Sequence, residues 1–364
     1  MLDNLDEIKN YLKKRADKKI FLITGKKSFN KSGANLLFKS FLSKINLEIY
    51  FKRSFVPEIN ELKKIISLIK KFEPDIILAI GGGTVIDYAK VACCTDLKQL
   101  TFKKIILGKV EHLKKYELCV IPTTAGSGAE VTSNAVIFIK NSKFSFENSN
   151  LIPDNFFILS SLVLKLNQKI KASSGFDAIA QAIESLISIK SNRVSVNFAK
   201  QSLELSIKNY LNFLKSPNKS NAFEMCLSAN LSGKAINISK TTAPHAVSYP
   251  FTSYFKISHG HAVSLTLEKF LMFNYNNINY SKANFNLKDR YKTLFKITKT
   301  NSIIELILFL KKLKREANLE DDFKKMNIDI EKNLSKILKG VNELRLKNNP
   351  INLTKNDISN ILLV

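Results

Sequence analysis

The chain has 364 residues, of which 57 are lysine or arginine and 31 are aspartate or glutamate, so its formal net charge at pH 7 is +26. Its length exceeds the roughly 250–300 residues at which a single core stops growing, and two domains are expected. Hydrophobic residues make up 45% of the chain, as in a globular protein able to bury a large core. No apolar run reaches the roughly 18 residues needed to span a bilayer, so no membrane partner is expected.

The high positive charge suggests nucleic-acid binding as one hypothesis. Lysine supplies nearly all of this charge, however, and the lysines are scattered rather than gathered into one basic arm. Arginine, which suits bidentate contacts to phosphate and guanine, occurs only at positions 15, 53, 193, 290, 315 and 345. We therefore expect no nucleic-acid partner and attribute the lysines to a compositional drift of the source genome.

The first 19 residues form a charged amphipathic stretch without the apolar middle of a signal peptide, and the expected location is the cytoplasm. The four cysteines show no zinc-ligand spacing, and we expect them to be reduced core residues: Cys93, Cys94, Cys119 and Cys226.

The first part of the chain alternates between helical spacing and short apolar runs. In chain order we expect a helix over 2–17, a strand over 18–25, a helix over 33–45, a strand over 47–53, a helix over 59–72 and a strand over 75–80. Helices that alternate with fully apolar strands indicate right-handed βαβ units and a doubly wound parallel sheet.

A glycine-rich segment, GGGTVIDYAK (81–90), directly follows the strand at 75–80 and opens a helix. Glycines let the backbone approach a pyrophosphate, and a helix N-terminus supplies oriented N–H groups for it. The segment lacks the G-x-G-x-x-G pattern, and a plain tight turn is the alternative. The residues expected to bind a nucleotide here are Gly81, Gly82, Gly83, Thr84 and Asp87.

A second loop, IPTTAGSGAEVT (121–132), follows another apolar strand, ELCVIP. Its small and hydroxyl-bearing residues suit a ligand that needs close backbone approach: Thr123, Thr124, Gly126, Ser127 and Gly128. Two such loops on successive strands favour nucleotide binding more strongly than one.

From about residue 165 onward, long helical patterns replace the strand-like runs. They cover 176–189, 194–214, 221–238, 261–273, 302–316 and 329–347, while the Asn-rich segment 277–301 is expected to be irregular or a surface helix. We expect a boundary near 161–173, which divides the chain into an α/β domain over 1–165 and an all-α domain over 166–364.

Three of the four histidines, His245, His259 and His261, lie in the stretch 241–261. Upstream, in GFDAIAQAIES, Asp177 and Gln181 are four apart and share one face of a helix. Two imidazoles and a carboxylate on converging helices can hold a divalent transition metal with a position left open for substrate. The alternative is that His245 is a satisfied core histidine and His259 an ordinary surface one.

Four ordered motifs resemble one family, the iron-containing (group III) alcohol dehydrogenases: GGGTVIDYAK, PTTAGSGAEVT, GFDAIAQAIES and the HA-x12-HG spacing of 245–260. The resemblance covers essentially the whole chain. It implies a Rossmann-like dinucleotide-binding domain, an all-α metal-binding domain, a dehydroquinate synthase-like architecture and an active site in the cleft between the domains. It also implies hydride transfer between NAD(P)H and a small aldehyde or alcohol, and a homodimer is the expected assembly.

That resemblance implies a metal, Fe2+ or Zn2+, held by an Asp, a His four residues later and two further His fourteen apart. Asp177, His245 and His259 match three of these ligands, whereas Gln181 stands where the family has histidine. An amide oxygen is a weaker, neutral ligand than an imidazole, and a metal-free enzyme is the alternative.

Tyr249 stands where many relatives have a histidine beside the substrate, and a phenol can still donate a hydrogen bond or relay a proton. His261 is the other catalytic candidate, with a helix-start surface residue as its alternative reading.

Within the family, residues 235–265, Gln181 and RLKNNP (345–350) look most like the phosphonoacetaldehyde reductase branch, whose members form 2-hydroxyethylphosphonate. A dianionic substrate needs cationic and hydroxyl donors. The candidates near the histidines are Lys234, Lys240, Thr241 and Thr242, although either lysine could be solvated surface. The alternatives are a general aldehyde or diol dehydrogenase with a neutral substrate, a dehydroquinate synthase-like lyase that uses NAD transiently, and a non-enzymatic nucleic-acid-binding protein.

Members of this family that prefer NAD carry an aspartate at the end of the first strand. Here the strand reads FLITGKKSF, so Gly25 takes that place and Lys26 and Lys27 follow it. No carboxylate would repel a 2′-phosphate, and we expect NADPH to be accepted at least as well as NADH. The alternative is that Gly25 only closes the turn and the lysines are solvated.

Overall fold

The computed structural model describes residues 3–43, 45–140 and 142–363. Its chain forms two compact units. The first extends to Leu166 and also includes Asn218–Cys226, and the second consists of Asn167–Pro217 and the chain from Leu227 onward.

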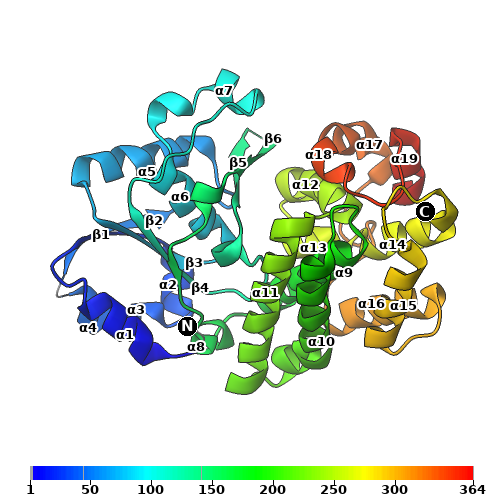
Figure 1. The fold of residues 1–364 in the computed structure, drawn as a ribbon, viewed down its shortest axis with the longest axis horizontal. Coiled ribbons are helices and arrows are strands. Elements are labelled where there is room, and N and C mark those ends of the chain that lie inside the picture. The colour runs from blue at the N-terminus through cyan, green and yellow to red at the C-terminus, as the bar shows by residue number, and fades with distance from the viewer. Residues whose placement is uncertain (1–2, 44, 141, 364) are drawn as a thin grey trace. The chain divides into compact units, whose positions relative to one another are not determined.

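The first unit is built on a parallel sheet with strand order β2-β1-β3-β4-β7, of which Figure 1 labels β1, β2, β3 and β4. Its strands are β1 (Lys19–Gly25), β2 (Asn46–Lys52), β3 (Ile76–Gly81), β4 (Glu117–Pro122) and β7 (Asn155–Phe156). A separate antiparallel hairpin, which the sequence reading did not anticipate, pairs β5 (Asn134–Ile139) with β6 (Ser142–Glu147). The parallel sheet confirms the α/β fold class expected from the alternating pattern.

Helices connect these strands. They are α1 (Leu5–Lys13), α2 (Lys26–Lys31), α3 (Ala34–Leu37), α4 (Lys39–Leu42), α5 (Ile59–Phe72), α6 (Gly83–Cys94), α7 (Phe102–Ile106) and α8 (Ser160–Leu164), with 3-10 turns at Leu97–Gln99, Ala129–Val131 and Ser149–Leu151. The single helix expected over 33–45 is instead two short ones, because the backbone of Phe38 leaves the helical region (φ −102°, ψ 0°) while its side chain is buried. Residue 44 lies outside the described part of that segment.

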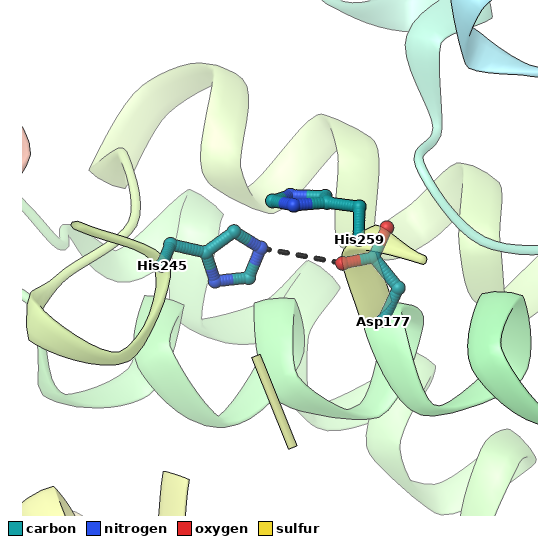
Figure 2. A group of neighbouring side chains, drawn as sticks. All are labelled: Asp177, His245 and His259. Carbon is teal, nitrogen blue, oxygen red and sulfur yellow. Dashed lines mark ion pairs between the residues drawn. The ribbon is translucent and has the colours of Figure 1, made fainter. Parts of the chain in front are cut away.

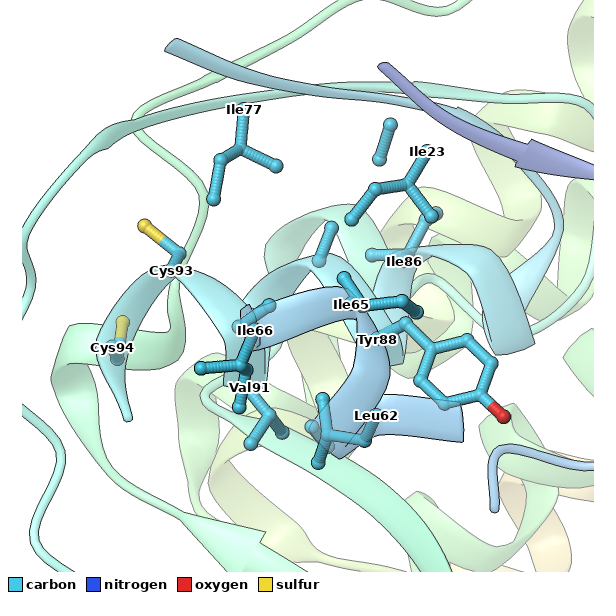
Figure 3. Packing of buried hydrophobic residues seen from close by; sticks show 14 of the residues in the cluster. Ile23, Leu62, Ile65, Ile66, Ile77, Ile86, Tyr88, Val91, Cys93 and Cys94 are labelled. Carbon is cyan, nitrogen blue, oxygen red and sulfur yellow. The ribbon is translucent and has the colours of Figure 1, made fainter. Parts of the chain in front are cut away.

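Both faces of the sheet are covered, as the apolar strands predict. Successive β1 side chains enter different cores: Phe21 and Ile23 pack in a cluster with α5 and α6, and Ile20 and Leu22 pack in another with α1 and α2. Figure 3 shows the first cluster, in which side chains of both helices meet Ile23 and Ile77 of the sheet. All four cysteines are free and buried.

The second unit contains, among its described residues, helices and turns only. The helices are α9 (Gln168–Ile187), α10 (Arg193–Lys215), α11 (Lys219–Ser239, whose first residues belong to the first unit), α12 (Ala243–Phe255), α13 (His259–Ser264), α14 (Leu267–Asn276), α15 (Leu287–Thr298), α16 (Ile303–Glu316), α17 (Ile330–Lys339), α18 (Glu343–Leu346) and α19 (Lys355–Leu363), with a 3-10 turn at Ile278–Tyr280. The segment 277–301 thus carries the helix α15. None of the helices formed by described residues has the length and apolar character needed to span a bilayer.

Two small-scale features of α12 and α13 position the site. In α13, Gly260 packs directly on α9, where an added Cβ would lie 1.9 Å from the Ser173 carbonyl oxygen and 2.8 Å from Asp177 Cβ. In α12, Pro250 has no N–H to donate, so the Ala246 carbonyl one turn earlier lacks its helical partner. That carbonyl accepts a hydrogen bond from the backbone N–H of Asn342 instead, at 3.1 Å.

Candidate metal centre

Three side chains from three helices of the second unit converge: Asp177 of α9, His245 of α12 and His259 of α13 (Figure 2). One ligand atom from each lies within 4.8 Å of the other two. Asp177 and His245 are buried, with 5% and 3% of their surface exposed. The structure therefore brings together the three residues that the sequence singled out as strong ligands.

The chemistry of this group fits a divalent transition metal. His245 Nε2 is buried, finds no hydrogen-bond partner among the described residues and lies 3.3 Å from Asp177 Oδ1. The imidazole rings of His245 and His259 are 5.2 Å apart between centroids. Two imidazole nitrogens and one carboxylate oxygen form the mixed donor set of catalytic zinc and non-haem iron sites, in which a further position stays open.

A fourth residue, Glu184, supports this group and was not anticipated as a site residue. It lies on α9 seven positions after Asp177, hence on the same face, and is fully buried. One carboxylate oxygen accepts a hydrogen bond from His245 Nδ1, while the other accepts from the N–H and hydroxyl of Thr242, both at 2.9 Å. Glu184 thereby caps the first turn of α12 and leaves Nε2 as the ring nitrogen available to a metal.

The carboxylates also set the charge of His245 in the metal-free protein. Burial alone lowers the pKa of this imidazole, but Glu184 and Asp177 together raise it to about 9. The spacing of Asp177, Gln181 and Glu184 (i, i+4, i+7) within the GFDAIAQAIES motif was the signal that could have identified Glu184.

Gln181 is buried one turn after Asp177, and its amide oxygen accepts a hydrogen bond from Ser232 Oγ at 2.9 Å. His261 is directed elsewhere, because its Nε2 donates to the Glu320 carbonyl oxygen at 2.6 Å. Burial lowers the pKa of His261. The structure therefore does not include His261 in the group formed by Asp177, His245 and His259.

The Tyr249 ring lies beside the group, with its centroid 5.9 Å from that of His259. The residue is only 5% exposed. Burial raises the pKa of its phenol, and the nearby Arg345 side chain, which is within hydrogen-bonding reach, opposes that rise. A neutral phenol that can donate a proton or a hydrogen bond therefore borders the candidate metal centre.

Each of the four residues considered for substrate binding contacts another part of the second unit. Lys234 Nζ lies over the Phe198 ring, 5.8 Å from its centroid, and Lys240 Nζ donates to the Asn237 carbonyl oxygen at 2.9 Å. The Thr242 hydroxyl is occupied by Glu184. The carbonyl oxygen of Thr241 accepts from Asn348 Nδ2 at 3.0 Å, which ties residues near α18 to the start of α12.

In the first unit, the two glycine-rich loops lie against each other at the N-terminus of α6. An added Cβ would lie 3.3 Å from the Thr124 side chain at Gly82 and 3.1 Å from Ser127 Oγ at Gly83. At Gly81, which ends β3, it would lie 2.5 Å from Val85. Gly82 and Gly83 of the first loop are thus neighbours of Thr124 and Ser127 of the second at the N-terminus of α6, an arrangement suited to a pyrophosphate.

The other expected cofactor residues belong to the same unit. Thr84 is in the first turn of α6, and Gly126 is buried in the loop after β4. Thr123 donates its backbone N–H to the Gly81 carbonyl oxygen at 3.0 Å. Desolvation raises the pKa of Asp87 to about 6 despite the opposing charge of Lys90.

Gly25 ends β1 opposite Lys52 of β2, and an added Cβ at Gly25 would lie 3.8 Å from the Lys52 side chain. The end of the first strand therefore has the partly buried Lys52 side chain beside it, whose ammonium group donates to the Ser54 carbonyl oxygen, in addition to the lysines that follow in the chain.

Family models match nearly the full length of the chain. Residues 2–159 match the model of the iron-containing alcohol dehydrogenases, and residues 171–363 match the C-terminal domain of the same family. The chain belongs to the family of iron-containing alcohol dehydrogenases. The family and the fold class expected from the sequence are therefore confirmed. The candidate metal group consists of three of the residues expected as ligands.

Curated relatives are similar over part of their lengths. A 4-hydroxybutyrate dehydrogenase of Clostridium kluyveri is 29% identical over 62% of this chain and 63% of its own. A phosphonoacetaldehyde reductase of Streptomyces viridochromogenes is 29% identical over 57% of this chain and 55% of its own. The matched regions thus span less than two thirds of these relatives.

Among solved structures, a sulfoacetaldehyde reductase from Bifidobacterium kashiwanohense in complex with NAD+ has the same fold, with a TM-score of 0.85. It is 23% identical, and the match covers 100% of this chain and 95% of that one.

Proposed function

We propose that this protein is a metal-dependent, NAD(P)H-linked aldehyde reductase, an alcohol dehydrogenase whose substrate carries an anionic group. The first candidate substrate is phosphonoacetaldehyde, which would be reduced to 2-hydroxyethylphosphonate. Membership of the iron-containing family and the convergence of Asp177, His245 and His259 carry the proposal. The metal is Fe2+ or Zn2+, and a homodimer is the proposed assembly.

When bound, the metal supplies a Lewis acid for the substrate carbonyl, and the reduced nicotinamide supplies the hydride. Asp177, His245 and His259 would hold the metal, and Glu184 keeps His245 Nε2 directed toward it. The loops around Gly82 and Thr124 would hold the cofactor pyrophosphate. The Tyr249 phenol is our candidate for the group that donates a proton to the product oxygen, because it lies beside His259 and is protonated at neutral pH.

The names of the similar proteins support an anionic substrate. 4-Hydroxybutyrate, phosphonoacetaldehyde and sulfoacetaldehyde are short molecules that carry a carboxylate, a phosphonate or a sulfonate in addition to the reacting alcohol or aldehyde. The net charge of +26 would also favour the approach of anionic substrates over neutral ones.

A panel of aldehydes tests the proposal with protein reconstituted with Fe2+ or Zn2+ and with each reduced cofactor. Phosphonoacetaldehyde, sulfoacetaldehyde, succinate semialdehyde and propanal would be compared by the decrease in cofactor absorbance. We expect kcat/KM for phosphonoacetaldehyde to exceed that for propanal by about tenfold to a hundredfold or more. One charge-assisted contact contributes about this much. Equal efficiency with propanal would support the neutral-substrate alternative, and no turnover of any aldehyde would reject the proposed function.

A further inference from the structure

The short helix α18 is fixed against the first turns of α12 at both of its ends. At one end, the N–H of Asn342 donates to the Ala246 carbonyl that Pro250 leaves free, and the Asn342 side chain caps α18 by accepting from the N–H of Arg345 at 2.9 Å. At the other end, Asn348 Nδ2 donates to the Thr241 carbonyl at 3.0 Å. Arg345 is thus held beside the helix that carries His245 and Tyr249.

The guanidinium of Arg345 lies beside Tyr249, the residue that borders the candidate metal centre. It is within hydrogen-bonding reach of the Tyr249 phenol, and the Tyr249 ring is 5.9 Å from the His259 ring between centroids. Arg345 is partly buried, yet the ion pairs formed among the described residues do not include it. A partly desolvated cation without a carboxylate partner is suited to take up an anion from solution.

The donor geometry of arginine also fits this role. A guanidinium has five N–H donors in a plane, so a contact with one phenol oxygen leaves several donors for a second acceptor. Paired oxygens of a phosphonate, sulfonate or carboxylate match that fork, whereas an ammonium group acts as a point charge. Lys234 and Lys240, which the sequence suggested, contact Phe198 and the Asn237 carbonyl.

We propose that Arg345 binds the anionic group of the substrate, and with Tyr249 selects short aldehydes that carry such a group. This proposal rests on the proposed function for the reaction itself and adds the residue that decides the substrate class. The cation is positioned by backbone contacts of α18 with α12, the helix that supplies His245, so its position relative to that candidate ligand is set by the fold.

Arg345→Met tests the proposal because it removes the charge and keeps a long apolar side chain. Loss of the contact with Tyr249 would affect both aldehydes alike, so we expect the ratio of kcat/KM for phosphonoacetaldehyde to that for propanal to fall by about tenfold to a hundredfold. Arg345→Lys should retain part of the preference, and Lys347→Met, an exposed neighbour on the same segment, serves as the matched control and should change neither value. A similar loss on both aldehydes would assign Arg345 a structural role and overturn the proposal.

A binding measurement separates this inference from the proposed function. Titration calorimetry with methylphosphonate, an anion with no reactive carbonyl, needs no turnover. Binding by the unmodified protein that Arg345→Met abolishes and Lys347→Met preserves would support the anion site even if no aldehyde were reduced. Unchanged methylphosphonate binding in Arg345→Met would overturn the inference while leaving aldehyde reduction intact.

Discussion

The buried carboxylate of Glu184 accepts a hydrogen bond from Nδ1 of His245 and so directs Nε2 of that ring toward Asp177. Because the same carboxylate also accepts from Thr242 at the start of α12, one side chain both caps the helix and sets the tautomer of a candidate ligand.

Glu184→Gln should therefore weaken metal binding by roughly tenfold to a hundredfold, as is typical when the residue behind a metal-bound histidine is changed. The amide can still accept from Thr242, but its NH2 group cannot accept from Nδ1. Metal titrations of the purified variant measure the effect, and Glu204→Gln, an exposed glutamate on α10, is the matched control. An unchanged metal affinity in Glu184→Gln would show that the contact does not tune the ligand.

The ligand assignment makes a direct prediction. His245→Ala and His259→Ala should each abolish stoichiometric iron or zinc and most turnover, because each removes one of three strong donors. His261→Gln should keep its metal, since the His261 side chain contacts the Glu320 carbonyl instead. Metal content by elemental analysis decides, and full retention of metal in both alanine variants would refute the site.

The glutamine at position 181 offers a test in the opposite direction. Gln181→His should tighten metal binding by roughly tenfold or more, about 1.4 kcal/mol, if an imidazole at this position reaches the ion. Gln181 is one turn from Asp177, and its amide oxygen is held by Ser232, so Ser232→Ala would release the position without adding a ligand. No gain in affinity for Gln181→His would mean that the residue faces away from the metal.

Cofactor choice depends on the end of β1. We predict that NADPH is accepted at least as well as NADH and that Gly25→Asp shifts the preference toward NADH by tenfold or more, about 1.4 kcal/mol. Lys52→Met should lower the efficiency with NADPH more than with NADH, because Lys52 lies opposite Gly25. Steady-state kinetics with both cofactors provide the measurement, and strict NADH dependence of the unmodified enzyme would contradict the argument.

The contact between α13 and α9 predicts an effect on both stability and metal binding. Gly260→Ala should destabilise the helical unit by roughly 1–3 kcal/mol or more and weaken metal binding, because the new Cβ would overlap the Ser173 carbonyl and displace His259 from Asp177. Thermal unfolding and metal titration check this. Gly340→Ala, whose Cβ would lie 3.0 Å from Pro250 Cβ and 3.5 Å from the Ile337 carbonyl oxygen, should lose less, and an equal loss in the two variants would contradict the steric explanation.

Local signals in the chain were sufficient for four strands of the five-stranded sheet, all but β7, and for three candidate ligands. The apolar strands at 18–25, 75–80 and 117–122 could be recognised because burial on both faces demands continuous apolar residues. The β5–β6 hairpin was missed although Phe144 and Phe146 alternate with polar residues, because β6 is short and mostly half-exposed. Helix α12 carries an interior proline, which by local rules argues against a helix.

Contacts between distant residues limited what could be predicted of the site. Glu184 has a local signature, the face it shares with Asp177, but its partner Thr242 lies on another helix. Arg345 lies a hundred positions after His245, and its placement depends on a carbonyl that Pro250 leaves without a helical partner. Periodicity does not reveal such a pairing, because it arises only when α18 packs on α12.

The three candidate ligands lie on α9 and on the consecutive helices α12 and α13, so a bound ion would cross-link α9 to a segment far from it in the chain. Such a link closes long loops and adds its binding free energy to that of folding. The folding equilibrium of the helical unit would then depend on the concentration of free metal. The steady-state abundance of the protein in a cell would follow the availability of iron or zinc as well as the rate of synthesis.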